Sequence, residues 1–161
     1  MSVDERTLRN IRNAMNIALE EAGIAKTEEE LPYGAVVISP DGDFVARAHD
    51  RVHAHSDPTR HAEFDAVRLA ISKTPGALSG HILISTGEPC AMCSAAAWWA
   101  GIRMIAYGLS MTELKALAPE SMPEVMGPID SLNELLSDRI AALPGIARSE
   151  CLKLWRSGIQ R

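Results

Sequence analysis

Two short groups of residues could together bind a transition metal. His61 is followed by Ala62 and Glu63, and Cys90 and Cys93 stand three positions apart further along the chain. Each group follows a loop and begins a predicted helix, where free N–H groups and the helix dipole lower the pKa of a thiol. A spacing of three also places both sulfur atoms on one face of that helix. We therefore expect the two cysteines to bind metal as thiolates.

The number of ligands indicates a catalytic metal. Three protein ligands, His61, Cys90 and Cys93, are typical of catalytic zinc, which keeps a fourth position for water, whereas structural zinc takes four protein ligands. Zinc lowers the pKa of bound water to about 7. Glu63 lies two positions from His61, so it can reach that water without binding the metal. A carboxylate placed in this way contributes about 10²–10⁴-fold as a proton shuttle, and we expect Zn²⁺ as the cofactor.

The same residues carry a family resemblance. Residues 57–63 read Asp-Pro-Thr-Arg-His-Ala-Glu and residues 88–93 read Glu-Pro-Cys-Ala-Met-Cys, which fits the His-x-Glu and Pro-Cys-x-x-Cys signature of zinc nucleobase deaminases. From about residue 8 to 108 the chain resembles the cytidine-deaminase-like superfamily, in its branch of guanine deaminases and tRNA adenosine deaminases. The resemblance implies a hydrolase that replaces an amino group of a cyclic amidine by a carbonyl and releases ammonia. It also implies that the backbone N–H groups of Ala62 and Cys90 anchor the substrate.

Asp50 departs from the pattern of these relatives, which carry an asparagine at this position to recognise the base. Asparagine both donates and accepts, whereas an ionised aspartate only accepts. This predicts a substrate edge rich in N–H groups, such as that of an aminopurine or an aminotriazine. The alternative is that Asp50 is a capping residue of the loop.

Two further features concern the choice of substrate. One is a residue that differs from the relatives, and the other is a pair that resembles only the guanine deaminases. Arg60 replaces a small residue and could clamp a carboxylate or phosphate of the substrate, or could be a surface arginine. Trp98 and Trp99 resemble the Tyr-Trp pair of guanine deaminases and favour a free base, with Trp99 as a substrate contact. The same two residues would also suit helix packing or a dimer interface.

An acidic residue after the fourth strand enters the site of guanine deaminases. Here the position in register is about Ser121, flanked by Glu120 and Glu124, and Glu113 is a further candidate. We take Glu120 as the candidate substrate-binding residue. The alternative for all three glutamates is an acidic loop exposed to water.

Helices and strands alternate around these motifs. Apolar residues recur at helical spacing in the first segment, and turn formers at residues 39–43 separate two β-rich runs. The order α-β-β-α-β-α-β predicts an α/β fold, a three-layer α/β/α sandwich on a mixed, mostly parallel sheet of about five strands. The predicted elements are a helix at 4–23, a hairpin of strands 33–38 and 44–48, a helix from 61, a strand at 81–85, a helix at 90–100 and a strand at 104–107.

The region from residue 109 to 161 has a weaker pattern, which four prolines interrupt. Ser131 and Glu134 predict a capping box for a helix that carries Leu132, Leu135, Leu136 and Leu143. Residues 150–158 could form a closing helix. We expect one domain over residues 1–161, with this segment closing the pocket or the subunit interface of the homodimer that the family implies.

Composition limits the partners. The 161 residues carry a net charge of −5 and only 4% aromatic side chains, which argues against a long nucleic-acid ligand and for a small heterocyclic substrate. No signal peptide or membrane-spanning stretch is present, so we expect a cytoplasmic protein without a membrane partner. The function that we predict is deamination of a free nucleobase or related heterocycle, with a guanine-like purine or an aminotriazine favoured. The alternatives are a tRNA or other RNA adenosine deaminase and a non-catalytic zinc module.

Overall fold

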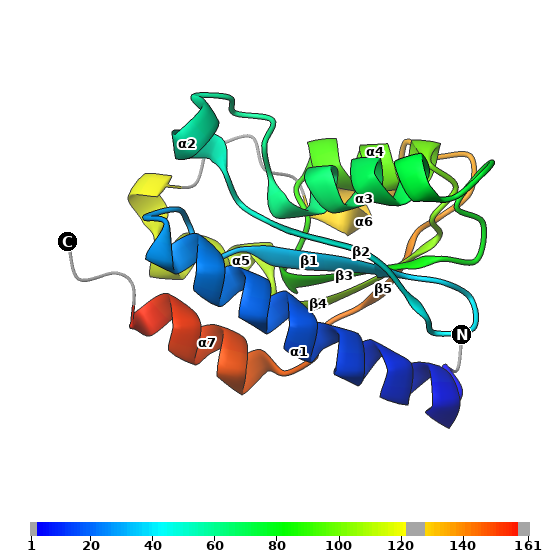
Figure 1. Cartoon of the computed structure of the whole chain (residues 1–161), viewed down its shortest axis with the longest axis horizontal. Coiled ribbons are helices and arrows are strands. Elements are labelled where there is room, and N and C mark those ends of the chain that lie inside the picture. The colour runs from blue at the N-terminus through cyan, green and yellow to red at the C-terminus, as the bar shows by residue number, and fades with distance from the viewer. Residues whose placement is uncertain (1–2, 122–127, 158–161) are drawn as a thin grey trace.

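Helices cover both faces of a single five-stranded sheet (Figure 1). The computed structural model describes residues 3–121 and 128–157 of the chain. The three-layer α/β/α sandwich expected from the sequence is confirmed. The elements are α1 (Glu5–Thr27), β1 (Gly34–Ile38), β2 (Phe44–His49), α2 (Val52–His55), α3 (Ala62–Lys73), β3 (Ile82–Gly87), α4 (Ala91–Trp99), β4 (Met104–Leu109), α5 (Met111–Leu117), the 3₁₀ helix η1 (Pro119–Ser121), α6 (Ile129–Asn133), β5 (Ala141–Leu143) and α7 (Arg148–Arg156).

The strands lie in the order β2-β1-β3-β4-β5, so β2 and β5 form the edges of the sheet. Strand β1 pairs antiparallel with both β2 and β3, whereas β3 with β4 and β4 with β5 are parallel pairs. The sheet is therefore mixed, as expected, but it has a second antiparallel pair. The sequence pattern did not reveal this pair, because hydrophobic alternation does not fix which strand lies next to which.

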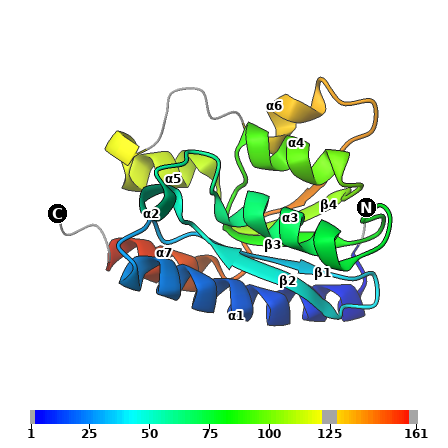
Figure 2. The same cartoon turned by 45° about the horizontal axis from the view of Figure 1, so that its top comes forward.

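Helices α1 and α7 pack side by side on one face of the sheet (Figures 1 and 2). Ile11 and Met15 of α1 are fully buried, and Trp155 of α7 is 1% exposed. A methyl group on Gly34 of β1 would collide with the carbonyl oxygen of Ala18, so glycine here allows α1 to lie directly against the strand. This close contact fixes α1 against the sheet.

Helices α3, α4 and α6 cover the opposite face (Figure 2). Their core contains Ala66 and Val67 of α3, Ala97 of α4, Leu83 of β3 and Ile105 of β4. Helices α3 and α4 also contact each other. Because each of these two helices begins at one of the predicted metal-binding groups, their packing brings the two groups together.

Three element boundaries differ from the sequence prediction. Helix α1 continues past Gly23 to Thr27, since Ala22 and Ala25 extend its buried face beyond the glycine. The predicted capping box of Ser131 and Glu134 is wrong, because α6 begins at Ile129 and ends at Asn133. Leu143 belongs to strand β5 and not to that helix.

The last helix, α7, begins at Arg148, two residues earlier than expected. Strand β5 was missed altogether, since a strand of three residues is too short to show a period. Strand β5 forms one edge of the sheet, and helix α7 belongs to the same helical layer as α1. This part of the C-terminal segment therefore completes the fold. Among the described residues, no helix is long and apolar enough to cross a membrane.

Candidate metal centre and active site

The three expected metal ligands meet where α3 and α4 begin. His61 precedes the first residue of α3, and Cys90 precedes the first residue of α4. Cys93 lies in the first turn of α4 and is fully buried. The ligand atoms of the three residues all lie within 4.8 Å of one another.

The spacing of these atoms fits a tetrahedral zinc ion. His61 Nδ1 lies 3.7 Å from the sulfur of Cys90 and 3.7 Å from that of Cys93. Bonds of about 2.3 Å to sulfur and about 2.0–2.1 Å to nitrogen at tetrahedral angles separate the two atoms by about 3.6 Å. A nitrogen and two sulfur donors are also the ligand types that zinc prefers. The residues therefore fit Zn²⁺ with three protein ligands.

The three side chains share protons through hydrogen bonds. The pKa of Cys90 falls to about 4, chiefly because it accepts a hydrogen bond from Cys93. The same hydrogen bond and burial raise the pKa of Cys93. The pKa of His61 rises to about 9, first because of its hydrogen bond with Cys90. Since a metal ion must displace these protons, we expect its affinity to increase with pH.

Glu63 is buried next to the metal ligands. It lies in the first turn of α3 and is 4% exposed. The hydroxyl of Ser85, on β3, donates to Glu63 Oε1 at 2.8 Å. Burial raises the pKa of Glu63. Ser85 was not among the residues that we expected, although a hydroxyl within the apolar run of a fully buried strand is a signal that could have found it.

Asp50, immediately after β2, is buried and is 3% exposed. Burial and the charges of Glu63 and Glu30 raise its pKa to about 7, against the opposing effects of His61 and of the N–H of Val52. Asp50 and Glu30 lie close enough for each to shift the pKa of the other. Because this pKa lies near neutral pH, Asp50 can carry a proton there, whereas the prediction from the sequence assumed an ionised aspartate. A protonated Asp50 can donate as well as accept.

Glu30 is a partner of this loop that could not be expected from the sequence. Its carboxylate accepts the N–H of His53 at 3.0 Å and that of Ala54 at 2.6 Å, at the start of α2. Burial raises the pKa of Glu30, but these two N–H groups outweigh it and the pKa is lowered. Glu30 therefore fixes the loop that carries Asp50.

Glu88, two positions before Cys90, holds the opposite side of the site. It is buried and accepts the N–H of Met111 at 2.8 Å and that of Ile129 at 3.1 Å. Its own N–H donates to the carbonyl of Leu109 at 2.7 Å. The sequence motif contains Glu88, but the residues that it would contact could not be read from the sequence.

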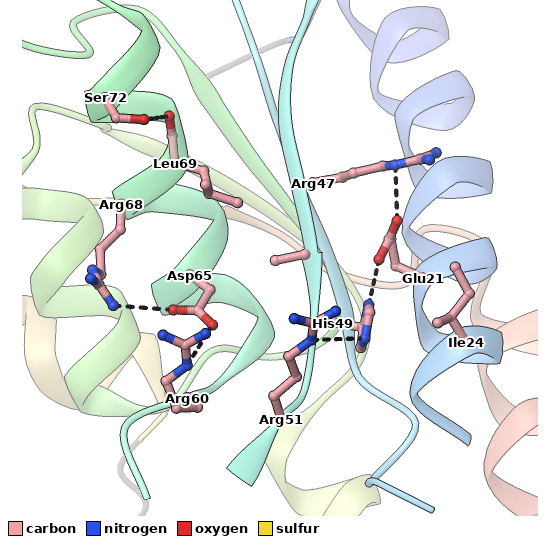
Figure 3. A pocket seen from close by; sticks show the side chains of 11 residues that line it. Glu21, Ile24, Arg47, His49, Arg51, Arg60, Asp65, Arg68, Leu69 and Ser72 are labelled. Carbon is pink, nitrogen blue, oxygen red and sulfur yellow. Dashed lines mark hydrogen bonds and ion pairs between the residues drawn. The ribbon is translucent and has the colours of Figure 1, made fainter. Parts of the chain in front are cut away.

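Arg60 lines a pocket whose lining residues do not include the three metal ligands (Figure 3). Its Nε lies 3.1 Å from Asp65 Oδ2, with which it forms an ion pair. The main chain of Ala62, by contrast, is buried at the start of α3, directly between His61 and Glu63. The contacts of Arg60 and Ala62 with a substrate stay predictions.

The remaining candidates lie at the surface or have structural partners. Trp99 is 81% exposed at the end of α4, and its ring meets that of Trp98 edge-on at 5.2 Å. Glu120 is exposed in η1. Glu113 caps α5 and accepts from Arg148 Nε at 2.6 Å. Glu124 lies outside the described residues.

Cys151 behaves as the inert thiol of a structural cysteine. It is fully buried in α7 and would collide with any side chain added at Gly108. Burial raises its pKa to about 12. A thiol with this pKa stays protonated and does not contribute to metal binding.

An α/β/α sandwich with a His-Cys-Cys donor set and a buried glutamate beside it defines the class of zinc-binding deaminases. The family model described as "Cytidine and deoxycytidylate deaminase zinc-binding region" matches residues 8–109. The chain belongs to this family of hydrolytic C–N deaminases. The resemblance seen in the sequence motifs is thereby confirmed.

Similar proteins carry several different names. The chain is 35% identical over 119 residues to a probable cytosine deaminase of Schizosaccharomyces pombe, covering 74% of this chain and 70% of the relative. It is 36% identical over 107 residues to a guanine deaminase of Bacillus subtilis, covering 64% of each. It spans less than two thirds of several other curated relatives.

A solved structure from studies of A-to-I editing by tRNA deaminases at the wobble position is 30% identical. It has a TM-score of 0.71, covering 88% of this chain and 98% of that one. Because tRNA deaminases are among the relatives, the expectation that nucleic acid is not a partner loses its support.

Proposed function

We propose that this protein hydrolytically deaminates a free amino-substituted nucleobase or related heterocycle and releases ammonia. A guanine-like purine or an aminotriazine is the favoured substrate. The observation that carries the proposal is the buried Glu63 beside three donor atoms with the spacing of a tetrahedral zinc site. A purely structural zinc site needs no such carboxylate and takes a fourth protein ligand.

His61, Cys90 and Cys93 hold the metal, and the remaining residues handle protons and orientation. Zinc, when bound, supplies Lewis-acid activation of a water molecule. Glu63 accepts one proton from the attacking water and passes it to the ring nitrogen of the amidine. It then takes the second proton, from the hydroxyl group just added to the ring carbon, and passes it to the departing amine. The oxygen of water thus becomes the carbonyl oxygen, and the amino group leaves as ammonia. Ser85 keeps the Glu63 carboxylate in one orientation through its 2.8 Å hydrogen bond.

Asp50 is proposed to recognise the substrate ring. It lies close enough to His61 and Glu63 for their charges to affect its pKa. Since it can be protonated near pH 7, it can present one acceptor and one donor, like the asparagine that relatives carry there. The substrate edge that Asp50 faces therefore need not consist of donors alone, and a purine edge with one donor and one acceptor suits it.

A second candidate is deamination of adenosine within tRNA. The similarity to a solved structure from studies of tRNA deaminases, with 30% sequence identity and a TM-score of 0.71, favours it. The net charge of −5 opposes it, because binding to RNA depends on contacts between basic side chains and phosphates. The two candidates share the same chemistry and differ in the size of the substrate.

An ammonia-release assay on the zinc-loaded protein tests the proposal. The substrates are guanine, cytosine, adenine, an aminotriazine and an adenosine-containing tRNA anticodon stem-loop. We expect turnover of at least one free base, and loss of at least about 10²-fold in the Glu63→Gln variant because its proton shuttle is removed. Metal analysis of Glu63→Gln should show unchanged zinc content, since Glu63 is not a ligand.

The outcomes separate the candidates. Ammonia from the stem-loop alone would replace the free-base proposal by the tRNA proposal. Full activity of Glu63→Gln, or a purified protein that takes up no zinc, would refute both. The homodimer, the cytoplasmic location and the substrate contacts of Trp99 and Glu120 stay predictions.

A further inference from the structure

A pocket of about 540 Å³ lies at the edge strand β2, between α1 and α3 (Figure 3). Four arginines line it: Arg47 from β2, Arg68 from α3, and Arg51 and Arg60 from the segments before α2 and α3. The backbone N–H of Arg51 donates to the carbonyl of Arg60 at 3.0 Å, which ties these segments together. Four arginines from separate parts of the chain therefore line one pocket, with Arg47 turned toward Glu21 of α1 and Arg60 and Arg68 toward Asp65 of α3 (Figure 3).

The lining carries more positive than negative charge. The described residues that line it include four arginines and two carboxylates, those of Glu21 and Asp65. Two more glutamates lie next to the pocket but do not line it. Glu20 lies 3.9 Å from Arg47, and Glu28 lies 3.1 Å from His49; their side chains are 68% and 43% exposed. Water and salt screen such exposed charges, including those of Arg47 and Arg68, whose side chains are 50% and 59% exposed. This excess is unusual for a chain with a net charge of −5.

The arginines retain free hydrogen-bond donors. Asp65 is shared, with Oδ2 3.1 Å from Arg60 Nε and Oδ1 3.5 Å from Arg68. Arg51 Nε donates to His49 Nε2 at 3.2 Å. The buried Arg60 Nε has no partner of hydrogen-bond geometry within the described part of the chain. A guanidinium group has five N–H donors, so the pocket offers many that an anion could use.

Apolar side chains form opposite walls of the same pocket. Ile24 of α1 and Leu69 of α3 lie on opposite sides of β2 (Figure 3). Both are exposed, at 40% and 42%. A ligand with an anionic group and an apolar ring would satisfy the arginines and cover these two side chains.

We propose that this arginine pocket binds the phosphate group of a nucleotide. The nucleotide is either free or part of an RNA strand. The pocket adjoins the metal centre through the chain itself, since Arg51 follows Asp50 and Arg60 precedes His61. The inference does not rest on the proposed deamination, because binding can be measured without turnover.

Uridine monophosphate and uridine are suitable probes for a free nucleotide. Neither has an amino group, so neither can be deaminated during the measurement. Isothermal titration calorimetry on the zinc-loaded protein should show binding of the monophosphate and at least about tenfold weaker binding of uridine, which lacks the charge-assisted hydrogen bonds. Fluorescence anisotropy with a labelled oligouridylate tests the RNA source.

The Arg51→Gln/Arg68→Gln double variant removes two guanidinium groups and leaves the ion pair of Arg60 with Asp65 in place. We expect binding to weaken by about tenfold or more for each arginine. Arg12→Gln is the matched control, because Arg12 is exposed on α1 and lies outside the pocket.

A second pair of variants tests the pocket without removing an ion pair. Leu69→Glu places a negative charge in the pocket wall, and Ile71→Glu places the same charge elsewhere on α3, at a side chain that is 49% exposed. Only Leu69→Glu should weaken binding. Circular dichroism and zinc content check that each variant is folded.

Loss of binding in the pocket variants, with the controls unchanged, supports the proposal and the responding probe identifies the source. Absence of binding by both the monophosphate and the oligouridylate would overturn it. Equal losses in Leu69→Glu and Ile71→Glu, or wild-type binding by the double arginine variant, would also overturn it. None of these results depends on whether ammonia is released from any base.

Discussion

The Asp50→Asn substitution gives the sharpest test of the electrostatics around the metal centre. Asparagine has nearly the same shape as aspartate but does not titrate. Asp50 is buried, and its pKa is raised from 3.8 to about 7, chiefly by that burial. The folded state therefore holds a proton on Asp50 over a pH range in which the unfolded state has lost it.

The sign and size of the effect follow from this pKa. A carboxyl group with a raised pKa stabilises the fold most below pH 3.8, and that contribution is lost as the pH rises through about 7. A shift of about three units corresponds to about 4 kcal/mol in total, at about 1.4 kcal/mol per unit. About 2 kcal/mol of this is lost between pH values of about 5.5 and 8. Asp50→Asn should gain that much in stability relative to wild type over this interval.

Urea unfolding followed by circular dichroism measures the effect at several pH values. EDTA-treated protein is used, so that metal release does not add its own pH dependence. Asp57→Asn is the control, because hydrogen bonds from Thr59 lower the pKa of Asp57 and it stays ionised throughout the interval. A difference between wild type and Asp50→Asn that stays constant with pH would show that Asp50 has an ordinary pKa.

Three further predictions concern the active site and the fold. Ser85→Ala should lower kcat by about tenfold with unchanged zinc content, because Glu63 loses the donor that orients it; steady-state kinetics and metal analysis check this. EDTA should abolish ammonia release but preserve the far-UV circular dichroism, and added Zn²⁺ should restore activity; retained activity would contradict the metal assignment. Gly34→Ala should lower the free energy of unfolding by about 1–3 kcal/mol, because the new methyl group meets Ala18; urea unfolding measures it, and a neutral result would mean that α1 can shift.

The metal centre could be predicted because its signal is local. His61, Cys90 and Cys93 stand in short motifs at two helix starts, and the chemistry of the side chains limits the metal. Helix α3 and the hairpin of β1 and β2 could likewise be read from apolar periodicity and turn residues. These features depend on neighbours in the sequence, which is the information that a single chain contains.

The surroundings of the site depend on contacts between distant residues. Glu30 meets Asp50 only because the loop after α1 returns to the end of β2, and no periodicity records this. The pKa of Asp50 could not be foreseen, because it depends on burial, which is a property of the folded chain. Arg60 is beside His61 in the sequence, yet its side chain lies with Asp65 in another pocket.

The contacts of Glu88 also indicate whether the region of the family match, residues 8–109, could fold as a separate unit. The family match ends at residue 109, but Glu88 accepts its two backbone hydrogen bonds from the N–H groups of Met111 and Ile129. Cutting the chain at the edge of the match would leave the buried Glu88 carboxyl group without these two donors, and leaving a buried acceptor unsatisfied costs about 1–3 kcal/mol. Glu88 stands two residues before Cys90, so this loss of stability would lie next to the metal ligands. A truncated or grafted version of the domain should therefore keep the chain through α6.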